Sequence, residues 1–217
     1  MAGWWHVIEF PDGTTTPGGW DLRPTANEIP WPDLAGKRCL DVGTASGFWA
    51  FEMEKRGAAD VLATDRPSPF QEMSRGHFEE ARTALGSSVR YEPCDVFDLE
   101  GEFDVVFMGF VLQMVTDPIR ALEAVRRVCR GHLLLLDTVS LPLTLLPAPL
   151  ARLDARRDGR EWFVFNPRGM RKVVELAGWT VEAQTGVLRD HQPQAKWHWK
   201  WITGARGRSS ALRARST

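Results

Sequence analysis

The sequence has few cysteines, and this excludes two common ways of stabilising a fold. Cys39, Cys94 and Cys129 are the only three among 217 residues, and they lie far apart. An odd number at such spacing indicates neither a disulfide framework nor a zinc site. We therefore predict no bound metal, and a chain long enough to fold on an apolar core alone.

Export signals and membrane-spanning segments are also missing. The first residues lack the basic stretch and the apolar stretch that make up a signal peptide. Among the longest apolar runs, residues 133–136 are too few to cross a bilayer and residues 141–150 are rich in proline. We therefore predict a cytoplasmic protein that does not enter a membrane.

Neither sign of charge prevails along the chain. It has 27 basic and 28 acidic residues, a net charge of −1, so no overall field attracts nucleic acid or an anionic membrane. Residues 191–217 are an exception, because they hold six basic residues and no acidic one. Such a run is typical of a solvated chain end, and it also suits a weak contact with a polyanion. We predict that residues 204–217 form a basic, disordered tail.

What the sequence does contain is the composition of a globular protein, with 43% hydrophobic and 25% charged residues. Residues 1–36 differ from the rest, since they are rich in glycine and proline and hold four of the ten tryptophans. Because the prolines interrupt any long helix, we predict an extended segment or short hairpin whose aromatic side chains pack near the active site. Residues 37–203 then form the main domain.

From residue 37 onward, strand-like and helix-like patterns alternate. Apolar runs predict strands at 37–42, 61–65, 89–92, 103–108 and 133–137. Helical spacing and capping residues predict helices at 48–56 and 70–85, and two more that begin at Pro118 and Pro167. This alternation predicts a parallel sheet with helices on both faces, whose ligand lies beyond the carboxyl ends of the strands.

The clearest period of two lies near the end of the chain, at residues 195–202. Trp197, Trp199 and Trp201 point to one side of the strand that we predict there. A face of this kind is typical of a buried core, although a ladder of tryptophans can also stack nucleic-acid bases.

A glycine-rich loop follows the first predicted strand. Gly43 and Gly47 allow a sharp turn and a close approach to a ligand, and the next helix directs free N–H groups to the same place. Asp65 ends the second strand, 22 residues after Gly43. A carboxylate at this position can accept hydrogen bonds from both hydroxyls of a ribose.

Two further strand ends complete the predicted pocket. Asp95 follows the third strand, where its carboxylate can accept a hydrogen bond from an exocyclic amine such as that of adenine. Met108 and Gly109 follow the fourth strand and offer backbone carbonyl groups. With Asp41 at the end of the first strand, three acids surround one glycine loop. They predict a site for a ligand that carries adenosine and a cationic head.

The loop also distinguishes among cofactors. A dinucleotide fingerprint needs G-x-G-x-x-G, and Ala45 stands where its second glycine would be. No Lys-Ser or Lys-Thr pair follows the glycines, which excludes a phosphate-binding P-loop. A cofactor without phosphates fits better, and we predict S-adenosylmethionine. A dehydrogenase is the least favoured function.

Residues 40–54, which read LDVGTASGFWAFEME, resemble the glycine-loop motif of class I S-adenosylmethionine-dependent methyltransferases. More narrowly, the chain resembles the group of proteins related to the tRNA wobble-uridine methyltransferase of the 5-oxyacetate pathway. The likeness extends over most of residues 4–186 and includes Arg56-Gly57-Ala58, Trp5-His6, Asp12-Gly13, Thr16-Pro17-Gly18, Ala63-Thr64-Asp65, 103–106, Asp117-Pro118 and Asn166-Pro167.

This resemblance implies a Rossmann-like α/β fold. Its sheet has seven strands and is mostly parallel, with an antiparallel last strand and helices on both faces. The methionine part of the cofactor would lie over residues 43–47, the ribose on Asp65 and the adenine near Asp95 and Val96. The residues that we predict to bind the cofactor are Asp41, Gly43, Thr44, Ala45, Gly47, Trp49, Asp65, Arg66, Cys94, Asp95, Val96, Met108 and Gly109.

The chain departs from its relatives in two respects. Where they often have Tyr-His after the fourth strand, this chain has Gln113 and Met114, so a histidine base is missing. Only about 36 residues precede the first strand, whereas the wobble-uridine enzyme has a large N-terminal region for RNA and a carboxylated cofactor. We therefore predict unmodified S-adenosylmethionine, and catalysis mainly by aligning the acceptor with the methyl group.

The substrate is less readable than the cofactor. The residues predicted to contact it are His6, Trp20, Gln113 and Trp162. His6 is the candidate for a general base toward a hydroxyl or amine, or else it is a hydrogen-bonded structural residue. The insert at residues 140–165 is either a lid over the site or an extra surface helix.

Together these observations predict a methyltransferase that acts on a small molecule. One alternative is a tRNA wobble-uridine methyltransferase that uses the basic tail and the tryptophan ladder to hold RNA. Steeply salt-dependent binding would distinguish this alternative. Another is a protein that binds the cofactor without catalysis and acts as a partner of other proteins. The oligomeric state is not predicted.

Overall fold

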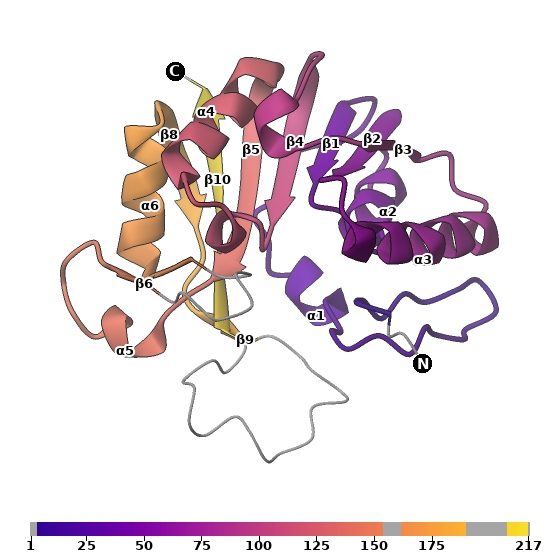
Figure 1. Cartoon of the computed structure of the whole chain (residues 1–217), viewed down its shortest axis with the longest axis horizontal. Helices are drawn as coiled ribbons and strands as arrows, with labels where there is room; N and C mark the ends of the chain where they lie inside the picture. The colour runs from indigo at the N-terminus through magenta and orange to yellow at the C-terminus, as the bar shows by residue number, and fades with distance from the viewer. Residues whose placement is uncertain (1–3, 154–161, 190–207, 217) are drawn as a thin grey trace.

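The chain folds around one mixed sheet (Figure 1). The computed structural model describes residues 4–153, 162–189 and 208–216. The sheet has eight strands, of which seven follow the order β3-β2-β1-β4-β5-β10-β8, and β9 pairs with β10. The strands are β1 (Arg38–Val42), β2 (Asp60–Asp65), β3 (Arg90–Pro93), β4 (Phe103–Gly109), β5 (Cys129–Thr138), β8 (Trp179–Gln184), β9 (Leu188–Arg189) and β10 (Arg208–Ser216).

Strand directions agree with the predicted fold class. Strand β1 pairs in parallel with β2 and β4, and the pairs β2–β3 and β4–β5 are also parallel. Strand β10 runs antiparallel to both of its main neighbours, β5 and β8. The prediction of a mostly parallel sheet whose last strand is antiparallel is therefore confirmed.

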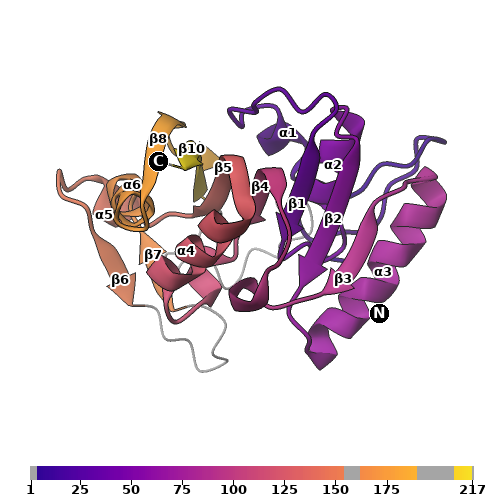
Figure 2. The ribbon, with the colours of Figure 1, turned by 90° about the horizontal axis from the view of Figure 1, so that it is seen from above.

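Helices cover both faces of the sheet (Figure 2). The main helices are α2 (Phe48–Lys55), α3 (Pro69–Leu85), α4 (Pro118–Val128) and α6 (Pro167–Leu176), and the short ones are α1 (Arg23–Ala26) and α5 (Leu141–Thr144). Helices α1, α2 and α3 pack into one apolar core, and α4 and α6 pack into the other. Each core lies between the sheet and its covering helices.

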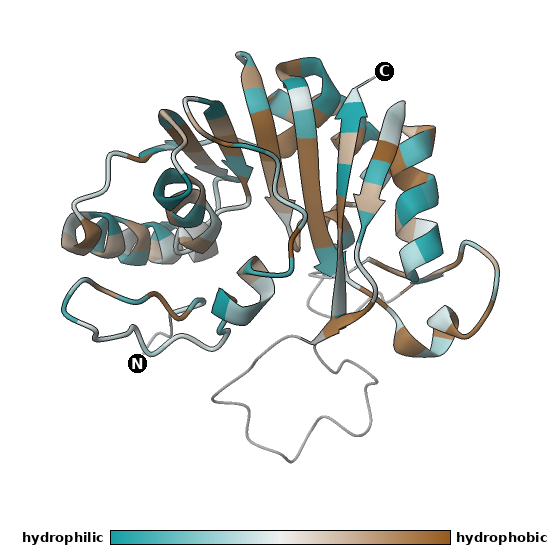
Figure 3. Cartoon of the chain, turned by 180° about the vertical axis from the view of Figure 1, so that it is seen from behind, coloured by the Kyte–Doolittle hydropathy of each residue, from teal (hydrophilic) through white to brown (hydrophobic). Residues whose placement is uncertain are grey.

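Strand β5 shows why the sequence of a strand inside the sheet is a continuous run of apolar residues. Leu133 and Leu135 pack into the core under α4 and α6, whereas Leu134 and Leu136 pack into the opposite core. All four are at most 1% exposed, and the strand is brown over most of its length in Figure 3. Because both faces are buried, side chains of either orientation must be apolar.

The end of the chain corrects the sequence prediction. We predicted a disordered tail over residues 204–217, but residues 208–216 form β10, which lies between β5 and β8 in the sheet. Ser209, Ser210 and Leu212 are fully buried there, whereas Arg215 is exposed. Small polar residues and outward arginines hide the strand pattern, and Figure 3 shows β10 as far less hydrophobic than β5. The strand predicted at 195–202, with its three tryptophans, lies outside the described residues.

The insert at residues 140–165 is not a single extra helix. Its described part holds α5, followed by a hairpin of β6 (Ala151–Leu153) and β7 (Phe163–Phe165). Asn166 ties the insert to α6, because its Oδ1 accepts from the N–H groups of Leu150 and Gly169 and its Nδ2 donates to two carbonyls of the insert.

Among the described residues, no helix is long and apolar enough to cross a membrane.

The first residues form an irregular arm at the carboxyl edge of the parallel strands. We call residues 4–22 the N-terminal arm. Its chain doubles back on itself, with bridges between His6 and Trp20 and between Glu9 and Thr15. In Figure 1, this arm and α1 lie at one side of the lower edge of the sheet, and α5 lies at the other. The site described below lies at the strand ends between them.

Candidate active site

The glycine loop joins β1 to α2 through three left-handed backbone positions. The φ angles are +76° at Gly43, +47° at Ala45 and +94° at Gly47. A Cβ on Gly47 would overlap the ring of Phe51 in α2 and approach Phe78 in α3 to 2.7 Å, so only glycine fits. Ala45 is the exception, since a residue with a Cβ is strained in this conformation. The loop must therefore be held in place by its surroundings.

Asp65, at the end of β2, provides part of that hold. Its Oδ2 accepts a hydrogen bond from the N–H of Ala45 at 3.0 Å, and its Oδ1 accepts from the N–H of Arg66 at 3.0 Å. The carbonyl of Thr64 accepts from the N–H groups of Gly43 and Thr44. The predicted ribose acceptor and the predicted glycine loop are thus in direct contact.

Asp41, at the end of β1, is a buried carboxyl group beneath the loop. It is 1% exposed, and neither oxygen has a hydrogen bond of normal geometry with the part of the chain that the structure describes. Burial raises the pKa of Asp41 to about 7, and the negative charge of Asp65 also raises this pKa. The nearby Thr44 hydroxyl and Ala50 backbone amide act in the opposite direction. A positively charged partner would therefore stabilise the ionised form of Asp41.

Asp95, the third of the predicted acids, lies close to Asp65 at the strand ends. The N–H of Cys94 donates to the carbonyl of Asp65 at 2.9 Å, which places the end of β3 next to the end of β2. Asp95 follows, and its Oδ1 accepts from the N–H of Phe97 at 3.1 Å, so it caps the short helix η1 (Val96–Asp98). Val96 is buried in the core under α4. The carboxyl of Asp95 therefore has a structural use as well as a place at the predicted adenine end.

Two of the predicted cofactor residues have their side chains in the core. Met108 is fully buried in the core under α4 and α6. Trp49 lies on the opposite face, with its ring 4.5 Å from that of Phe107 and 6.2 Å from that of Trp31. Trp49 is 2% exposed. Packing accounts for the Met108 side chain and for the ring of Trp49, whose Nε1 has no hydrogen-bond partner among the described residues. The backbone of Met108 and Gly109 forms the end of β4.

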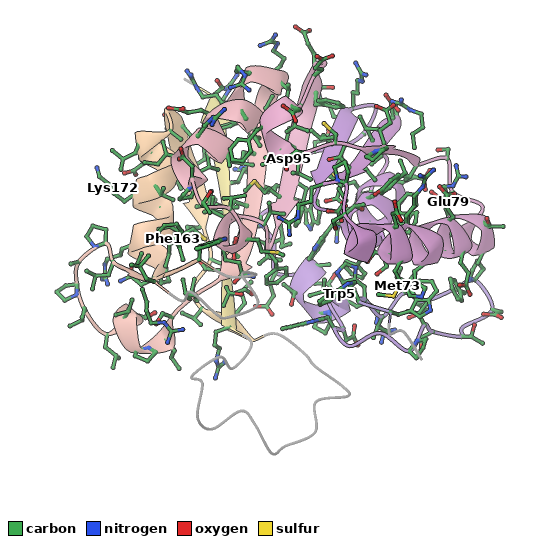
Figure 4. The ribbon with its side chains drawn as sticks, viewed as in Figure 1. Trp5, Met73, Glu79, Asp95, Phe163 and Lys172 are labelled. Atoms are coloured by element: carbon green, nitrogen blue, oxygen red, sulfur yellow. The ribbon has the colours of Figure 1, made fainter. Side chains whose placement is uncertain are left out.

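The predicted substrate residues come from two sides of the strand ends. The ring of Trp20, from the N-terminal arm, lies 6.2 Å from the ring of Phe110, just after β4. The carbonyl of Gln113, in the short helix η2 (Leu112–Met114), accepts from the N–H of Trp162 at 2.7 Å. Gln113 is buried, and its Oε1 has no hydrogen-bond partner among the described residues. In Figure 4, Trp5 of the arm and Phe163 of the insert lie on opposite sides of this edge.

His6 is held by the glycine loop. Its Nδ1 lies 3.2 Å from the hydroxyl of Ser46, and its backbone N–H donates to the same oxygen at 3.3 Å. Burial lowers the pKa of His6 to about 4, so its ring is uncharged at neutral pH. Whichever ring nitrogen carries the proton, Nδ1 is already engaged by Ser46. This geometry suits a structural contact better than a general base.

Sequence reasoning missed Ser46 and Asp137. Ser46 is fully buried within the loop itself. Asp137 is 2% exposed near the end of β5, where its Oδ2 accepts from the N–H of Gln113 at 3.2 Å and its Oδ1 accepts from the N–H of Thr138. Asp137 follows an apolar run, as Asp41 and Asp65 do, and this signal could have identified it.

The described site fits the predicted cofactor. Asp41 is a buried carboxyl without a normal hydrogen bond, and the charge of Asp65 raises its pKa, so a ligand with a positive charge would stabilise both groups. The acids make the site unfavourable for a phosphate. The described residues contain no group of three or more His, Cys, Asp or Glu that could hold a metal ion.

A parallel sheet with a glycine loop and acids at adjacent strand ends defines an α/β protein that binds an adenosine-containing cofactor. The model of one family, the methyltransferase domain, matches residues 22–184. The chain belongs to this family, and it is an S-adenosylmethionine-dependent methyltransferase. The class predicted from residues 40–54 is therefore confirmed, whereas nothing in the comparisons shows the wobble-uridine group.

Named relatives and solved structures agree with this class. The chain is 27% identical over 177 residues to a ubiquinone biosynthesis O-methyltransferase of Acinetobacter baylyi, covering 76% of this chain and 72% of that one. Its fold is similar to an S-adenosylmethionine-dependent methyltransferase of Mesorhizobium loti, with a TM-score of 0.61, 17% identity and coverage of 89% and 97%. It is also similar to magnesium protoporphyrin IX methyltransferase of Synechocystis, solved with bound S-adenosylhomocysteine, with a TM-score of 0.59, 17% identity and coverage of 85% and 76%.

Proposed function

We propose that this methyltransferase transfers the methyl group to a hydroxyl oxygen of a small aromatic molecule. The observation that carries the proposal is the likeness, over 76% of the chain, to a relative named as an O-methyltransferase of ubiquinone biosynthesis. The aromatic rings of Trp20 and Phe110 at one side of the strand ends support a planar acceptor. Gln113 of η2 and Trp162 of the insert, which are joined by a backbone hydrogen bond, would supply the other wall.

The residues around the glycine loop would hold the cofactor. Asp41 would face its ammonium group, Asp65 would accept from the ribose hydroxyls, and Asp95 with Val96 would lie at the adenine. Backbone atoms of residues 43–47 and of Gly109 would line the rest. When bound, S-adenosylmethionine supplies a methyl group on a sulfonium, which is transferred by in-line displacement.

The protein's own part in this reaction is to align the acceptor and exclude water. At the end of β4, where a histidine base would lie, the chain has Gln113 and Met114. His6 is a weak base, because burial lowers its pKa to about 4, and its Nδ1 contacts Ser46. Reaction then depends on the acidity of the acceptor, which favours a phenol, whose pKa is near that of tyrosine at about 10, over an alcohol.

The described residues give little support to the RNA alternative. One of its two supports, the basic tail, is in part the sheet strand β10, where Arg213 donates to Glu182 at 3.1 Å. The other, the tryptophan ladder at residues 195–202, lies outside the described residues. We therefore place a small molecule first.

A turnover screen tests the proposal. The protein would be incubated with S-adenosylmethionine and matched sets of phenols, amines, carboxylates and unmodified tRNA, and release of S-adenosylhomocysteine would be measured. Turnover of a phenol that is lost in Asp65→Ala is the expected result. Turnover of amines or carboxylates alone would overturn the choice of oxygen, and salt-sensitive turnover of tRNA alone would overturn the small molecule. Cofactor binding without any turnover would point to an inactive partner protein.

A further inference from the structure

The N-terminal arm and the glycine loop meet at one pair of residues, His6 and Ser46. Two groups of His6, the backbone N–H and the ring Nδ1, lie at 3.3 and 3.2 Å from the hydroxyl oxygen of Ser46. Both residues are buried, and they are 40 positions apart in the sequence. The contact is therefore made by the tertiary fold.

His6 itself is fixed within the arm. The hydroxyl of Thr16 donates to the carbonyl of His6 at 2.7 Å, and the N–H of Val7 donates to the carbonyl of Trp20 at 2.8 Å. Gly18 lies directly against the peptide group between His6 and Val7, so any Cβ there would overlap that backbone. The arm therefore presents His6 to the loop in one defined position, and the ring of Phe48 packs edge-on to His6 at 6.0 Å.

Ser46 occupies the position where support is most needed. It follows Ala45, whose positive φ is unfavourable for a residue with a Cβ. Asp65 holds Ala45 from the side of β2, through the hydrogen bond at 3.0 Å. His6 holds the next residue, Ser46, from the side of the arm. The loop is thus fixed from two sides at two adjacent residues.

We propose that His6 is a positioning residue for the cofactor, which acts through Ser46 to hold the glycine loop in its binding conformation. The N-terminal arm is then part of the binding machinery and not merely a cover for the core. This inference rests on the proposed placement of the cofactor at the loop. Because coupling is reciprocal, the bound cofactor must also stabilise the arm.

A set of variants tests this coupling by calorimetric titration with S-adenosylhomocysteine. We expect His6→Ala and Ser46→Ala each to weaken binding about 3- to 10-fold, the usual effect of one or two hydrogen bonds. The double variant should bind as Ser46→Ala alone does, because Ser46→Ala already removes both hydrogen bonds with His6. His6→Asn, which keeps an amide atom near the position of Nδ1, should restore most of the affinity.

Controls separate positioning from folding and from the placement of the cofactor. Glu175→Gln removes an exposed ion pair with Arg171 on α6, away from the arm and the loop, and should leave the affinity unchanged. If both single variants only lower the melting temperature and still bind like the parent protein, the proposal is wrong. If Asp65→Ala also binds the ligand normally, the cofactor does not lie at this loop, and the proposed placement of the cofactor is wrong whatever the role of His6. Should His6→Ala not fold, Ser46→Ala removes the ring hydrogen bond from the loop side, together with the bond from the backbone N–H of His6.

Hydrogen exchange gives a second, independent readout. We expect S-adenosylhomocysteine to slow amide exchange in residues 4–22 of the parent protein. The same ligand should slow exchange in the glycine loop of Ser46→Ala but leave its arm unprotected. Equal protection of the arm in both proteins would show that the contact between His6 and Ser46 does not connect the arm to the site.

Discussion

Ala45 and Asp65 are joined by a hydrogen bond of 3.0 Å from the backbone N–H of the first to Oδ2 of the second. The bond connects the residue with the unfavourable backbone conformation to the acid that is proposed to hold the ribose. Asp65 restrains the loop, and in the proposed site it would also contact the ligand. A substitution at Asp65 changes both at once, and the predictions begin there.

Replacing Asp65 by asparagine should weaken cofactor binding by roughly 1–3 kcal/mol, because hydrogen bonds to a charged acceptor are replaced by weaker neutral ones. The measurement is calorimetric titration with S-adenosylhomocysteine at pH 8. Asp33→Asn, at an exposed aspartate whose carboxylate accepts only a local backbone N–H at 3.0 Å, is the matched control. A folded Asp65→Asn protein that binds like the control would show that the ligand does not lie on this acid.

Cofactor binding should depend on pH through Asp41. Its pKa is raised to about 7, mainly by burial, so the group is largely protonated below that pH. An ammonium group nearby favours the carboxylate, and binding then releases a proton. The affinity for S-adenosylhomocysteine should therefore fall as the pH is lowered below 7, by at most tenfold per pH unit.

Titrations at pH 6, 7 and 8 in two buffers of different ionisation enthalpy would measure the released proton directly. Asp41→Asn provides the control, because an amide cannot titrate, and its weaker binding should be nearly constant over this range. A parent protein whose affinity is the same at pH 6 and pH 8 would mean that Asp41 does not face the cationic end of the ligand.

In the absence of cofactor, Asp41 should also lower the free energy of unfolding at alkaline pH. Its pKa is about 7 in the folded state and 3.8 in the reference state, so the folded state holds a proton that the unfolded state loses above pH 4. The stabilising effect is present below pH 3.8 and is lost as the pH rises through 7, by roughly 4 kcal/mol in total. Asp41→Asn should therefore melt at a higher temperature than the parent at pH 8 but not at pH 4. The reverse order at pH 8 would contradict a buried, unpaired carboxylate.

The strand ends and the glycine loop that carry the proposed cofactor site could be predicted, because local sequence defines each of them. Gly43 and Gly47 mark the turn after a buried strand, and Asp41 and Asp65 stand at the ends of apolar runs. The order of strands and helices then brings these ends to one edge of the sheet. Trp49 stays a prediction as a cofactor residue, because its ring packs in the core of its own helix and of the sheet.

Contacts between distant parts of the chain could not be predicted in this way. Nothing in the sequence around Ser46 indicates that His6 lies against it, since the pairing depends on how the arm folds back. Strand β10 was missed for a different reason. A strand buried between two others can be built from serine and alanine, and Arg213 with Arg215 gave its sequence the look of a solvated tail.

Because β10 lies between β5 and β8, the effect of a substitution in β10 on stability should depend on how buried the side chain is, and not on its charge. Leu212 is fully buried, whereas Arg215 is exposed. Leu212→Ala should lower the free energy of unfolding by roughly 2–5 kcal/mol, the usual cost of a cavity in a core. Arg215→Ala should change it by about 0.5 kcal/mol or less. Urea unfolding of both variants would measure these two changes. Equal stabilities would show that residues 208–216 are a solvated tail and not a buried strand.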